Sequence, residues 1–404
     1  MPPNPFHSDN DTASKIESYT SKLSAELREM REAVYPPEAR KTFVRTFSTL
    51  DLVRLLKVPE STLRQLSIEG KGPQPERLDN NRRAYTLEQV RELRSFLAEM
   101  RPDDAGHLLP HRRNGEKLQV IATANFKGGS SKTTTSIHLS HFLGLQGYRV
   151  LCIDLDPQAS MTSLFGIQPE FDLGDNETAY AALRYDNLRR SFADVIRPTY
   201  FPGVDLVPGN LELMDFEFDT PANLTSRSRD ELGLFFERLR KALARVEDRY
   251  DIVILDTPPS LGYSTLAALY AATSLVITVH PAMLDVASCN QFLLMISDLA
   301  GVLDQFGAQF EHDFLRFLLT RVNPNDGPQK YMSGVMRRLF GNDVLVAEAL
   351  ESTAIAGASV AKKSLYELES GEVGREALRR AIESADRVNF EILALIHKVW
   401  GRSE

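Results

Sequence analysis

The sequence has few cysteines and no long apolar runs. Cys152 and Cys289 are the only cysteines in 404 residues, too few for a disulfide framework or an ordinary four-ligand structural zinc site. No apolar run approaches the ~20 residues that a membrane span needs. The N-terminal stretch MPPNPFHSDNDTASK carries no apolar signal segment. We therefore expect a soluble, intracellular protein in a reducing compartment.

The chain also lacks an overall basic charge. Its net charge of -8 argues weakly against a general nucleic-acid binder. The charge is unevenly divided, because residues 41–113 hold 14 Lys or Arg and 10 Asp or Glu, a net of +4, which leaves -12 for the remainder. The basic part is therefore local. A chain of this length with 43% hydrophobic residues can form two or three domains.

Residues 14–34 carry a single apolar stripe at helical spacing. The stripe consists of apolar residues at steps of three and four: Ile16, Tyr19, Leu23, Leu27, Met30 and Val34. This spacing predicts an amphipathic helix close to the coiled-coil repeat, and Tyr35-Pro36-Pro37 ends it. The repeat covers only about two to three heptads, so a helix packed on its own domain and a dimerisation helix both fit. We interpret residues 1–40 as an N-terminal amphipathic helix for dimerisation.

Residues 41–105 have the pattern of a winged helix-turn-helix. Two short amphipathic helices are predicted over 50–56 and 60–68, with a tight break between them. A polar stretch ends in RRAY (82–85), and TLEQ (86–89) forms a capping box that opens a third helix. The stretch between the helices resembles the wing of a MerR-type module.

The same pattern predicts which side chains would contact DNA. Ser61, Thr62, Arg64 and Gln65 would face the major groove, and Arg82 and Arg83 would contact phosphates or a minor groove. An ordinary small helical domain with a solvated basic face is the alternative. Residues 106–117 are interpreted as a linker.

From Leu118 onward, apolar segments alternate with helical patterns. Near-continuous apolar runs suit a mostly parallel sheet that helices bury on both faces. The predicted strands are 118–124, 149–156, 204–209, 251–257, 274–280 and 313–320. Residues 118–404 are therefore predicted to be an α/β domain with its functional residues at the carboxyl ends of the strands.

The stretch NFKGGSSKTTT (125–135) follows the first of these strands and precedes a helical pattern. It departs from the phosphate-loop pattern G-x-x-x-x-G-K-[ST] at Phe126 and Ser131, but strand, Gly-containing turn, Lys-Thr and helix is the context that such a loop requires. Backbone N–H groups of 129–134 would hold phosphates, with Lys132 on the β and γ phosphates and Thr133 on Mg²⁺. The predicted nucleotide-binding residues are Lys127, Gly128, Gly129, Ser130, Ser131, Lys132, Thr133 and Thr134.

Carboxylates follow two other predicted strands. Asp154 and Asp156 end one strand, and Asp256 ends another after four apolar residues, as expected of the aspartate that supports Mg²⁺ through water in phosphate-loop NTPases. A single Asp after a strand is more often a helix cap or turn residue. Three such features on parallel strands together predict an ATP/ADP and Mg²⁺ site.

These motifs resemble the deviant Walker ATPases of the ParA/MinD type. The resemblance rests on KGGxxKTT (127–134), DLDPQ (154–158) and DTPP (256–259), and it extends over most of residues 118–400. With the helix-turn-helix, the chain most resembles the RepA subgroup of ParA proteins from repABC-type plasmids. In this family the position of Phe126 is not restricted to glycine.

The resemblance implies a role for each matched residue. Lys127 would reach the phosphates of the partner subunit in an ATP-sandwich homodimer, so that dimerisation gates hydrolysis. Asp154 would orient the attacking water, and Asp256 would support Mg²⁺. Asn323 resembles a segment near the nucleotide base, although Asn-Pro is also a turn signal. Ser131 departs from the family glycine and would cost about 1 kcal/mol if the backbone there needs a positive φ.

The resemblance also implies partners. A plasmid partition ATPase would bind nucleoid DNA without sequence preference in its ATP state, respond to a ParB-type centromere-binding protein, and repress its own operon through the helix-turn-helix. Basic candidates for the nonspecific surface lie in the C-terminal part, and each is equally well a solvated charge. They are Lys362, Lys363, Arg375, Arg379 and Arg380.

Three other classes of protein share parts of this pattern. A repressor that uses nucleotide only as a ligand is one alternative, with Ser131 weakening turnover. A MinD-like membrane ATPase fits poorly, because the C-terminal stretch FEILALIHKVWGR has few basic residues. An iron-sulfur protein of the nitrogenase-reductase type is disfavoured, because neither cysteine lies in a matching loop motif.

Overall fold

The computed structural model describes residues 12–34, 41–78, 82–224, 230–369 and 371–402. They belong to two compact units, residues 1–42 and 43–404, and each unit is described by itself. The first contains α1 (Thr12–Val34), which covers the helix predicted from the apolar stripe. Ile16, Tyr19 and Leu23 are each more than half exposed in this unit. The side chains of Leu27, Met30 and Val34, which complete the predicted stripe, lie outside the described residues.

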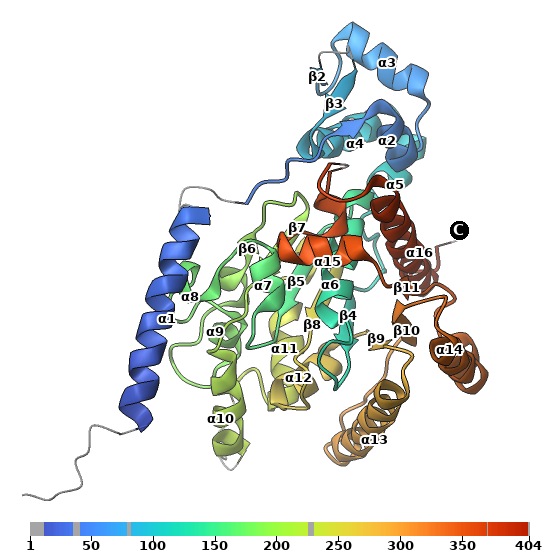
Figure 1. Ribbon diagram of the computed structural model, residues 1–404. Coiled ribbons are helices and arrows are strands. Elements are labelled where there is room, and N and C mark those ends of the chain that lie inside the picture. Colours follow the sequence, from blue (N-terminus) through green and yellow to red (C-terminus); the bar gives the residue numbers. More distant parts are fainter. Residues whose placement is uncertain (1–11, 35–40, 79–81, 225–229, 370, 403–404) are drawn as a thin grey trace, which may run out of the picture. The chain divides into compact units, whose positions relative to one another are not determined.

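The second unit begins with the elements predicted from the helix-turn-helix pattern (Figure 1). They are α2 (Thr49–Leu56), α3 (Glu60–Glu69), α4 (Leu87–Met100) and a small antiparallel sheet with the strand order β1-β3-β2, formed by β1 (Phe47–Ser48), β2 (Glu76–Arg77) and β3 (Arg83–Tyr85). Lys57 ends α2 in the left-handed conformation, at φ 50°. Thr86 accepts a hydrogen bond from Gln89 N at 3.2 Å, which confirms the predicted capping box.

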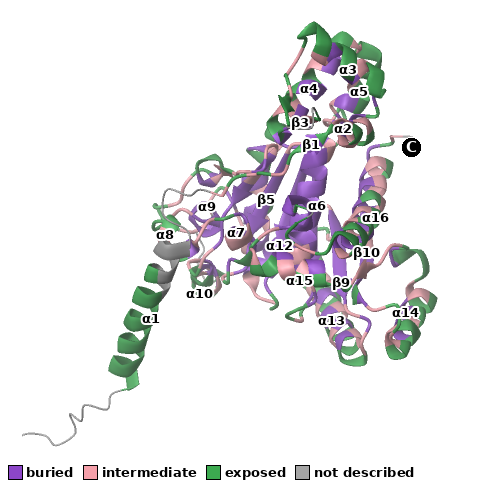
Figure 2. Ribbon diagram, turned by 45° about the horizontal axis from the view of Figure 1, so that its top comes forward, coloured by how far each residue is buried: buried purple, intermediate pink, exposed green. Residues whose placement is uncertain are grey.

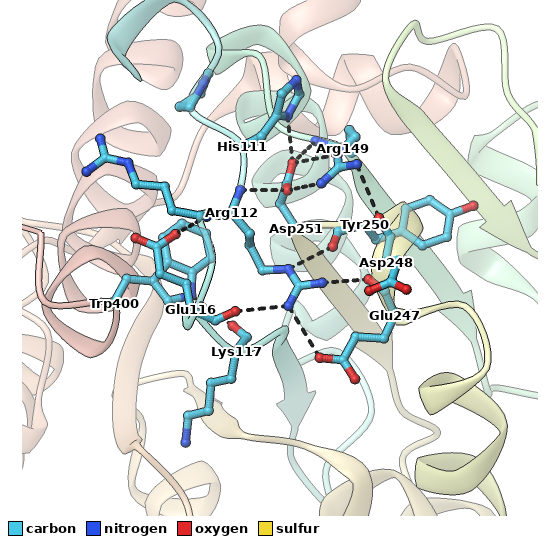
Figure 3. A network of polar contacts seen from close by, with 12 residues as sticks. His111, Arg112, Glu116, Lys117, Arg149, Glu247, Asp248, Tyr250, Asp251 and Trp400 are labelled. Atoms are coloured by element: carbon cyan, nitrogen blue, oxygen red, sulfur yellow. Dashed lines mark hydrogen bonds and ion pairs between the residues drawn. The ribbon is translucent and has the colours of Figure 1, made fainter. Parts of the chain in front are cut away.

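The segment interpreted as a linker is held firmly against the rest of the unit (Figure 3). It begins within α5 (Ala105–Leu108), which follows the 3₁₀ turn η1 (Pro102–Asp104). The Arg112 guanidinium donates to Glu247 O at 2.7 Å and to Tyr250 O at 3.0 Å. Asp251 accepts a bond from Arg112 N at 2.9 Å. These strong charge-assisted bonds make the segment part of the folded unit, which sequence composition did not reveal.

Asp251, at the start of the fourth predicted strand, is the carboxylate to which this docked segment is bound. His111 Nδ1 lies 2.9 Å from Asp251 Oδ2, and Arg149 donates to the same carboxylate at 2.7 Å. Burial acts to raise the pKa of Asp251, but the hydrogen bonds from His111 and Arg149 outweigh it and hold that pKa well below its usual value. The carboxylate is therefore ionised and ties the docked segment to β8 (Ile252–Asp256), the strand that directly follows Asp251.

The main sheet has eight strands, parallel except at one edge (Figure 1). The spatial order is β11 (Ala349–Leu350), β10 (Phe314–Val322), β9 (Ser274–Val279), β4 (Gln119–Ala124), β8 (Ile252–Asp256), β5 (Val150–Asp154), β7 (Val204–Val207) and β6 (Arg197–Pro198). The antiparallel strand is β6, which pairs with β7. All six strands predicted from the apolar runs are present, and β6 and β11 were not predicted because they are too short to carry a pattern.

Helices cover both faces of the sheet, and alternate strand residues point to each. Ile121, Cys152 and Ile254 pack in one core, whereas Ala122, Ile153 and Leu255 pack in the other. The first core includes α6 (Lys132–Gln146), α7 (Ser160–Leu164) and α16 (Arg375–Val399), and also the apolar residues of the α2–α4 module. Figure 2 shows β5 and α6 as buried.

The opposite face is covered by helices from the middle of the chain. They are α9 (Ala179–Leu183), α10 (Leu213–Leu224), α11 (Phe235–Ala244), α12 (Tyr263–Ala271) and α13 (Met283–Gln305). The remaining helices are α8 (Pro169–Asp172), α14 (Gly327–Phe340) and α15 (Thr353–Val360). Because both faces are covered, the apolar strands are buried throughout, as a parallel sheet requires.

By length and composition, α13 is long and apolar enough to cross a membrane, which differs from the expectation of no such run. Cys289, Phe292 and Ile296 on its inner side belong to the core that covers the sheet. The helix is therefore a packed element of the domain, with apolar residues on both its inner and outer sides.

Candidate nucleotide site

The loop between β4 and α6 is positioned by the strands on both sides of it. Asn125 Oδ1 accepts a bond from Lys127 N at 2.9 Å, and the Asn125 amide donates to Thr278 O at the end of β9. Thr320 at the end of β10 donates to Ser130 O at 3.0 Å. The loop therefore has a fixed backbone before any ligand binds, with the N-terminus of α6 beyond it.

Ser131 adopts the left-handed conformation that only glycine takes without strain. Its φ is 71°, and Gly129 has a φ of 77°. The condition under which the serine was expected to cost stability is therefore met at this position. A side chain in this conformation costs on the order of 1 kcal/mol, although the backbone N–H that would face a phosphate is kept.

Lys132 begins α6 and is almost fully buried, with 6% of its surface exposed. Its Nζ donates to Lys127 O at 3.4 Å, within the loop itself. Burial lowers the pKa of Lys132, and the charges of Asp256 and Asp156 act in the opposite direction. The ammonium thus lies beside two carboxylates at the strand ends, where a phosphate group would supply a better partner.

Asp256 at the end of β8 has one oxygen held and one free. Its Oδ1 accepts from Ser136 Oγ at 3.1 Å, whereas its buried Oδ2 has no hydrogen-bond partner in the described structure. Burial raises the pKa of Asp256 to about 6, and the Thr133 hydroxyl beside it acts against that shift. Hard oxygen donors and a buried oxygen without a partner suit Mg²⁺ held through water.

No group of three or more His, Cys, Asp or Glu side chains among the described residues is arranged to hold a metal by itself. A cation at Asp256 and Thr133 would therefore depend on phosphate oxygens for much of its coordination. This is the usual situation for Mg²⁺ in nucleotide sites.

Asp154 and Asp156 occupy different environments, although they are two residues apart. Asp154 is fully buried, and its Oδ2 accepts from Thr162 N at 2.8 Å and from Thr162 Oγ1 at 2.7 Å. Its Oδ1 accepts from Asp156 N at 3.2 Å. Asp156 is 9% exposed, and burial raises its pKa, although the hydrogen bond from Gln158 N and the charge of Lys132 act in the opposite direction. Sequence reasoning assigned a role only to Asp154.

Asp154 and Asp256 share the buried edge of the sheet, where β5 and β8 pair with these two residues in register. Burial raises the pKa of Asp154 to about 7, and the charge of Asp256 adds to this effect. Two carboxylates in one desolvated region favour retention of a proton. A bound cation would reverse this preference.

A cavity of about 310 Å³ opens beside the loop, between α6, β10, α16 and the segment that runs from β11 into α15. Its lining includes Ser131, Thr134, Thr320, Arg321 and Glu351. Because the carboxylates on β8 and β5 mark the side of the terminal phosphate and Mg²⁺, a nucleoside would extend toward this cavity on the β10 side.

Asn323, predicted to lie near the base, does not line the cavity. Its Oδ1 accepts from Asn325 N at 3.0 Å, and its N–H donates to Gln329 at 2.8 Å. The side chain therefore shapes the turn after β10, and a contact with nucleotide stays a prediction.

Lys127 is paired within its own subunit. Its Nζ lies 2.8 Å from Asp285 Oδ2 in the first turn of α13. The Lys127 side chain is 38% exposed, and Phe126 beside it is also exposed. No sequence pattern indicated Asp285, because it lies far along the chain and follows no strand directly.

The residues predicted to contact DNA are only partly free to do so. Ser61, Arg64 and Gln65 are exposed on α3. Thr62 is half-buried and accepts from Arg101 at 3.2 Å. In the strand β3, Arg83 donates to Ser67 Oγ at 3.0 Å, which ties β3 to α3. Arg82 is exposed.

Several basic candidates near the C-terminus are paired with acidic neighbours. Arg379 contacts Glu376 and Glu383, each at 2.6 Å, and Arg380 lies 3.2 Å from Glu376. Lys363 pairs with Glu372. These pairs reduce the positive charge that the segment offers to DNA, and its role in DNA binding stays a prediction.

The fold and the loop together define a phosphate-loop NTPase. The family model described as an AAA domain matches residues 118–305. The chain is 47% identical over 380 residues to "Putative replication protein A" of Sinorhizobium fredii, covering 94% of this chain and 93% of that protein.

Two further similarities show which family and which fold the chain has. A virulence plasmid ParA family protein of Chlamydia psittaci is 33% identical over 196 residues, covering 48% of this chain and 69% of the relative. A solved "Partition Protein" has the same fold, with a TM-score of 0.63 at 21% identity, covering 94% of this chain and 99% of that one. The chain belongs to the ParA family of phosphate-loop ATPases, in its RepA-like group.

Proposed function

We propose that the protein is a plasmid partition ATPase that cycles between an ATP-bound homodimer and an ADP-bound or free state. The observation that carries this proposal is the partial exposure of Lys127, the first lysine of the loop. Lys132 is buried where it would hold phosphates, whereas Lys127 is partly exposed and able to reach outward. A cation placed in this way can complete a phosphate site in a second subunit, so hydrolysis would depend on dimerisation.

Each residue of the site would have a separate role in phosphoryl transfer. Lys132 and the N–H groups of 129–134 would hold the phosphates, and Asp256 and Thr133 would hold Mg²⁺. Bound Mg²⁺ would neutralise charge on the phosphate oxygens. The attacking water needs a carboxylate with an accessible oxygen, and Asp156, close to Lys132 and slightly exposed, meets this need better than Asp154.

Substitution of the two carboxylates distinguishes their roles. Asp156→Ala should trap an ATP-bound dimer and abolish turnover while leaving the protein as stable as the wild type. Asp154→Ala removes the acceptor for both Thr162 donors, so it should lower the melting temperature. Trapping by Asp154→Ala in a stable protein, with normal turnover in Asp156→Ala, would restore the role first predicted for Asp154.

We further propose that the α2–α4 module is a winged helix-turn-helix that binds the operator. Ser61, Arg64 and Gln65 lie exposed on its second helix, the position of a recognition helix. The exposed apolar residues of α1 would be covered by the same helix of a second copy. Operator binding would repress the operon, and nucleoid DNA would be bound without sequence preference in the ATP state. The protein would act in the bacterial cytoplasm, associated with the nucleoid.

The central test is ATP hydrolysis by the full chain, measured alone, with nonspecific DNA, with a ParB-type partner, and with both. A partition ATPase should turn over slowly alone and faster with both present. A rate that never exceeds the basal value would contradict this proposal and favour a repressor that uses nucleotide only as a ligand. The strained Ser131 is the observation in favour of that second candidate.

Lys132→Ala tests the position of the nucleotide site. It should lower ADP affinity at least a hundredfold, measured by titration with a fluorescent ADP analogue, because the buried cation on the phosphates is lost. Lys330→Ala is the control, since Lys330 is exposed on α14 and belongs to none of the predicted nucleotide-binding residues. Near-normal binding by Lys132→Ala would mean that nucleotide binds elsewhere.

A further inference from the structure

The proposed role of Lys127 conflicts with its place in the single subunit. A lysine that serves the phosphates of a second subunit must be free to leave its own. Here the Lys127 ammonium lies 2.8 Å from Asp285 Oδ2, and the Asp285 side chain is only 12% exposed. The contact is therefore a partly desolvated ion pair, which is stronger than an exposed pair on the surface.

Both members of this pair are fixed to the same place in the fold. The backbone at Lys127 is held by Asn125, whose amide donates to Thr278 O on β9. Asp285 lies in the first turn of α13, which begins just after the end of β9. The N-terminal end of a helix also favours a carboxylate. The pair therefore forms without any movement of the loop or the helix.

An ammonium group is a compact charge on a flexible stem and cannot be in contact with two distant anions at once. Transfer of Lys127 to phosphates in a second subunit would break its contact with Asp285. The ion pair and the ATP sandwich thus compete for one cation. The strength of the pair would set how much ATP-bound protein is needed before dimers form.

We propose that Asp285 is a positioning residue that holds Lys127 in its own subunit until the phosphates of a second subunit replace it. This inference rests on the proposed ATP-dependent dimer. Asp285 would make dimerisation depend more steeply on nucleotide. Only a triphosphate bound in the second subunit offers enough negative charge to replace Asp285 as the partner of Lys127. Loss of the carboxylate would release the lysine early.

The test is the dimer dissociation constant of the full chain with Mg²⁺ and AMPPNP, measured by sedimentation equilibrium. Asp285→Asn keeps the shape and removes the charge, and it should lower this constant about tenfold. Asp285→Ser serves as a second variant if the asparagine variant is unstable. Asp298→Asn is the matched control on the exposed side of the same helix and should leave the constant unchanged.

Two further measurements separate this role from a structural one. In a Lys127→Met background, Asp285→Asn should have no effect on dimerisation, because the two substitutions act through one pair. In the native background, the ATPase of Asp285→Asn should reach half its maximum at about tenfold lower protein concentration. A lower plateau rate with unchanged dimerisation would overturn the proposal and show that Asp285 orients Lys127 for chemistry.

The outcomes also separate this inference from the proposed function. If the wild type forms dimers with AMPPNP and Asp285→Asn forms them no more tightly, only the holding role is wrong. If neither protein forms dimers at any AMPPNP concentration, the partition mechanism fails and the inference fails with it.

Discussion

At the scale of single residues, the site combines a loop with a strained backbone and a set of buried charges. Ser131 holds a left-handed backbone at the start of α6. Lys132, Asp156 and Asp256 lie at the same edge of the sheet with few exposed atoms. In the absence of nucleotide, burial opposes the charge on each of these groups. Bound phosphates and Mg²⁺ would supply the missing partners, so the site should be more stable when it is filled.

Ser131→Gly should stabilise the nucleotide-free protein by about 1 kcal/mol, because glycine adopts the observed positive φ without strain. The change is measured as the free energy of unfolding in urea. Ser288→Gly is the contrasting control, since Ser288 lies inside α13 and glycine there should destabilise by about 1 kcal/mol. A Ser131→Gly protein less stable than the wild type would show that the serine side chain makes a compensating contact. Turnover measured on the same variant would show whether the strain limits hydrolysis.

The buried carboxylates predict how stability depends on pH. The pKa of Asp154 is raised to about 7 and that of Asp256 to about 6, in both cases first by burial. The folded protein therefore keeps protons that the unfolded chain has released. This contribution to stability is fully present below the ordinary carboxyl pKa of about 4 and is lost as pH rises toward 7. The slope should reach ~1.4 kcal/mol per pH unit for each group.

Thermal unfolding of the nucleotide-free protein at pH 5, 6 and 7.5 measures this effect. Asp154→Asn should become more stable relative to the wild type as pH rises, because the amide carries no charge to bury. Asp175→Asn, at an exposed position, should show no such trend. A difference between Asp154→Asn and wild type that is constant over this range would contradict the raised pKa.

At the scale of elements, α6 connects the nucleotide loop with the α2–α4 module. Its first residue is Lys132, and the carbonyl of Leu145 near its other end accepts from Arg94 Nη2 on α4 at 2.8 Å. Arg94 also donates to Leu108 O and Leu55 O, each at 3.2 Å. Arg94 is 2% exposed, and these carbonyls hold its guanidinium without a carboxylate from the described residues. A cation at the C-terminal end of a helix also interacts favourably with the helix dipole.

Arg94→Ala should destabilise the protein by ~3 kcal/mol or more, because it leaves buried carbonyls without donors and opens a cavity. The free energy of unfolding in urea is the measurement. Arg64→Ala, at an exposed position on α3, is the control and should change stability by less than ~0.5 kcal/mol. Equal stability of the two variants would mean that the bonds of Arg94 contribute little to the fold.

At the scale of the whole molecule, residues 43–404 form one compact unit, and the apolar core of the α2–α4 module continues into the core around α6 and α16. The boundaries predicted at 105 and 118 stay a prediction. The docked segment 106–117 accounts for this continuity, because Arg112 and Asp251 join it to the sheet. A module attached in this way moves with the ATPase part more than a flexibly tethered one would.

A chain that lacks residues 1–113 should lose operator binding while it keeps ATP binding, because the phosphate loop lies on the sheet. It should also unfold at a lower temperature than the full chain, since apolar residues of α6 lose their cover. Fluorescence anisotropy with operator DNA and thermal unfolding measure the two effects. Specific operator binding by the truncated chain would refute the assignment of DNA binding to the module.

The sequence by itself determined the local structure and the chemistry of the loop. Near-continuous apolar runs of about five to eight residues predict buried strands. The capping box at Thr86 begins a helix without help from distant residues, and the residues of KGGSSKT that match the phosphate loop are adjacent in the sequence. Tertiary structure alone decided how distant groups meet. Asp285 reaches Lys127 from α13, Asp154 differs from Asp156 through Thr162, and Arg112 fixes a segment that composition marks as a linker. These contacts depend on the packing of helices around the sheet, which local patterns do not encode.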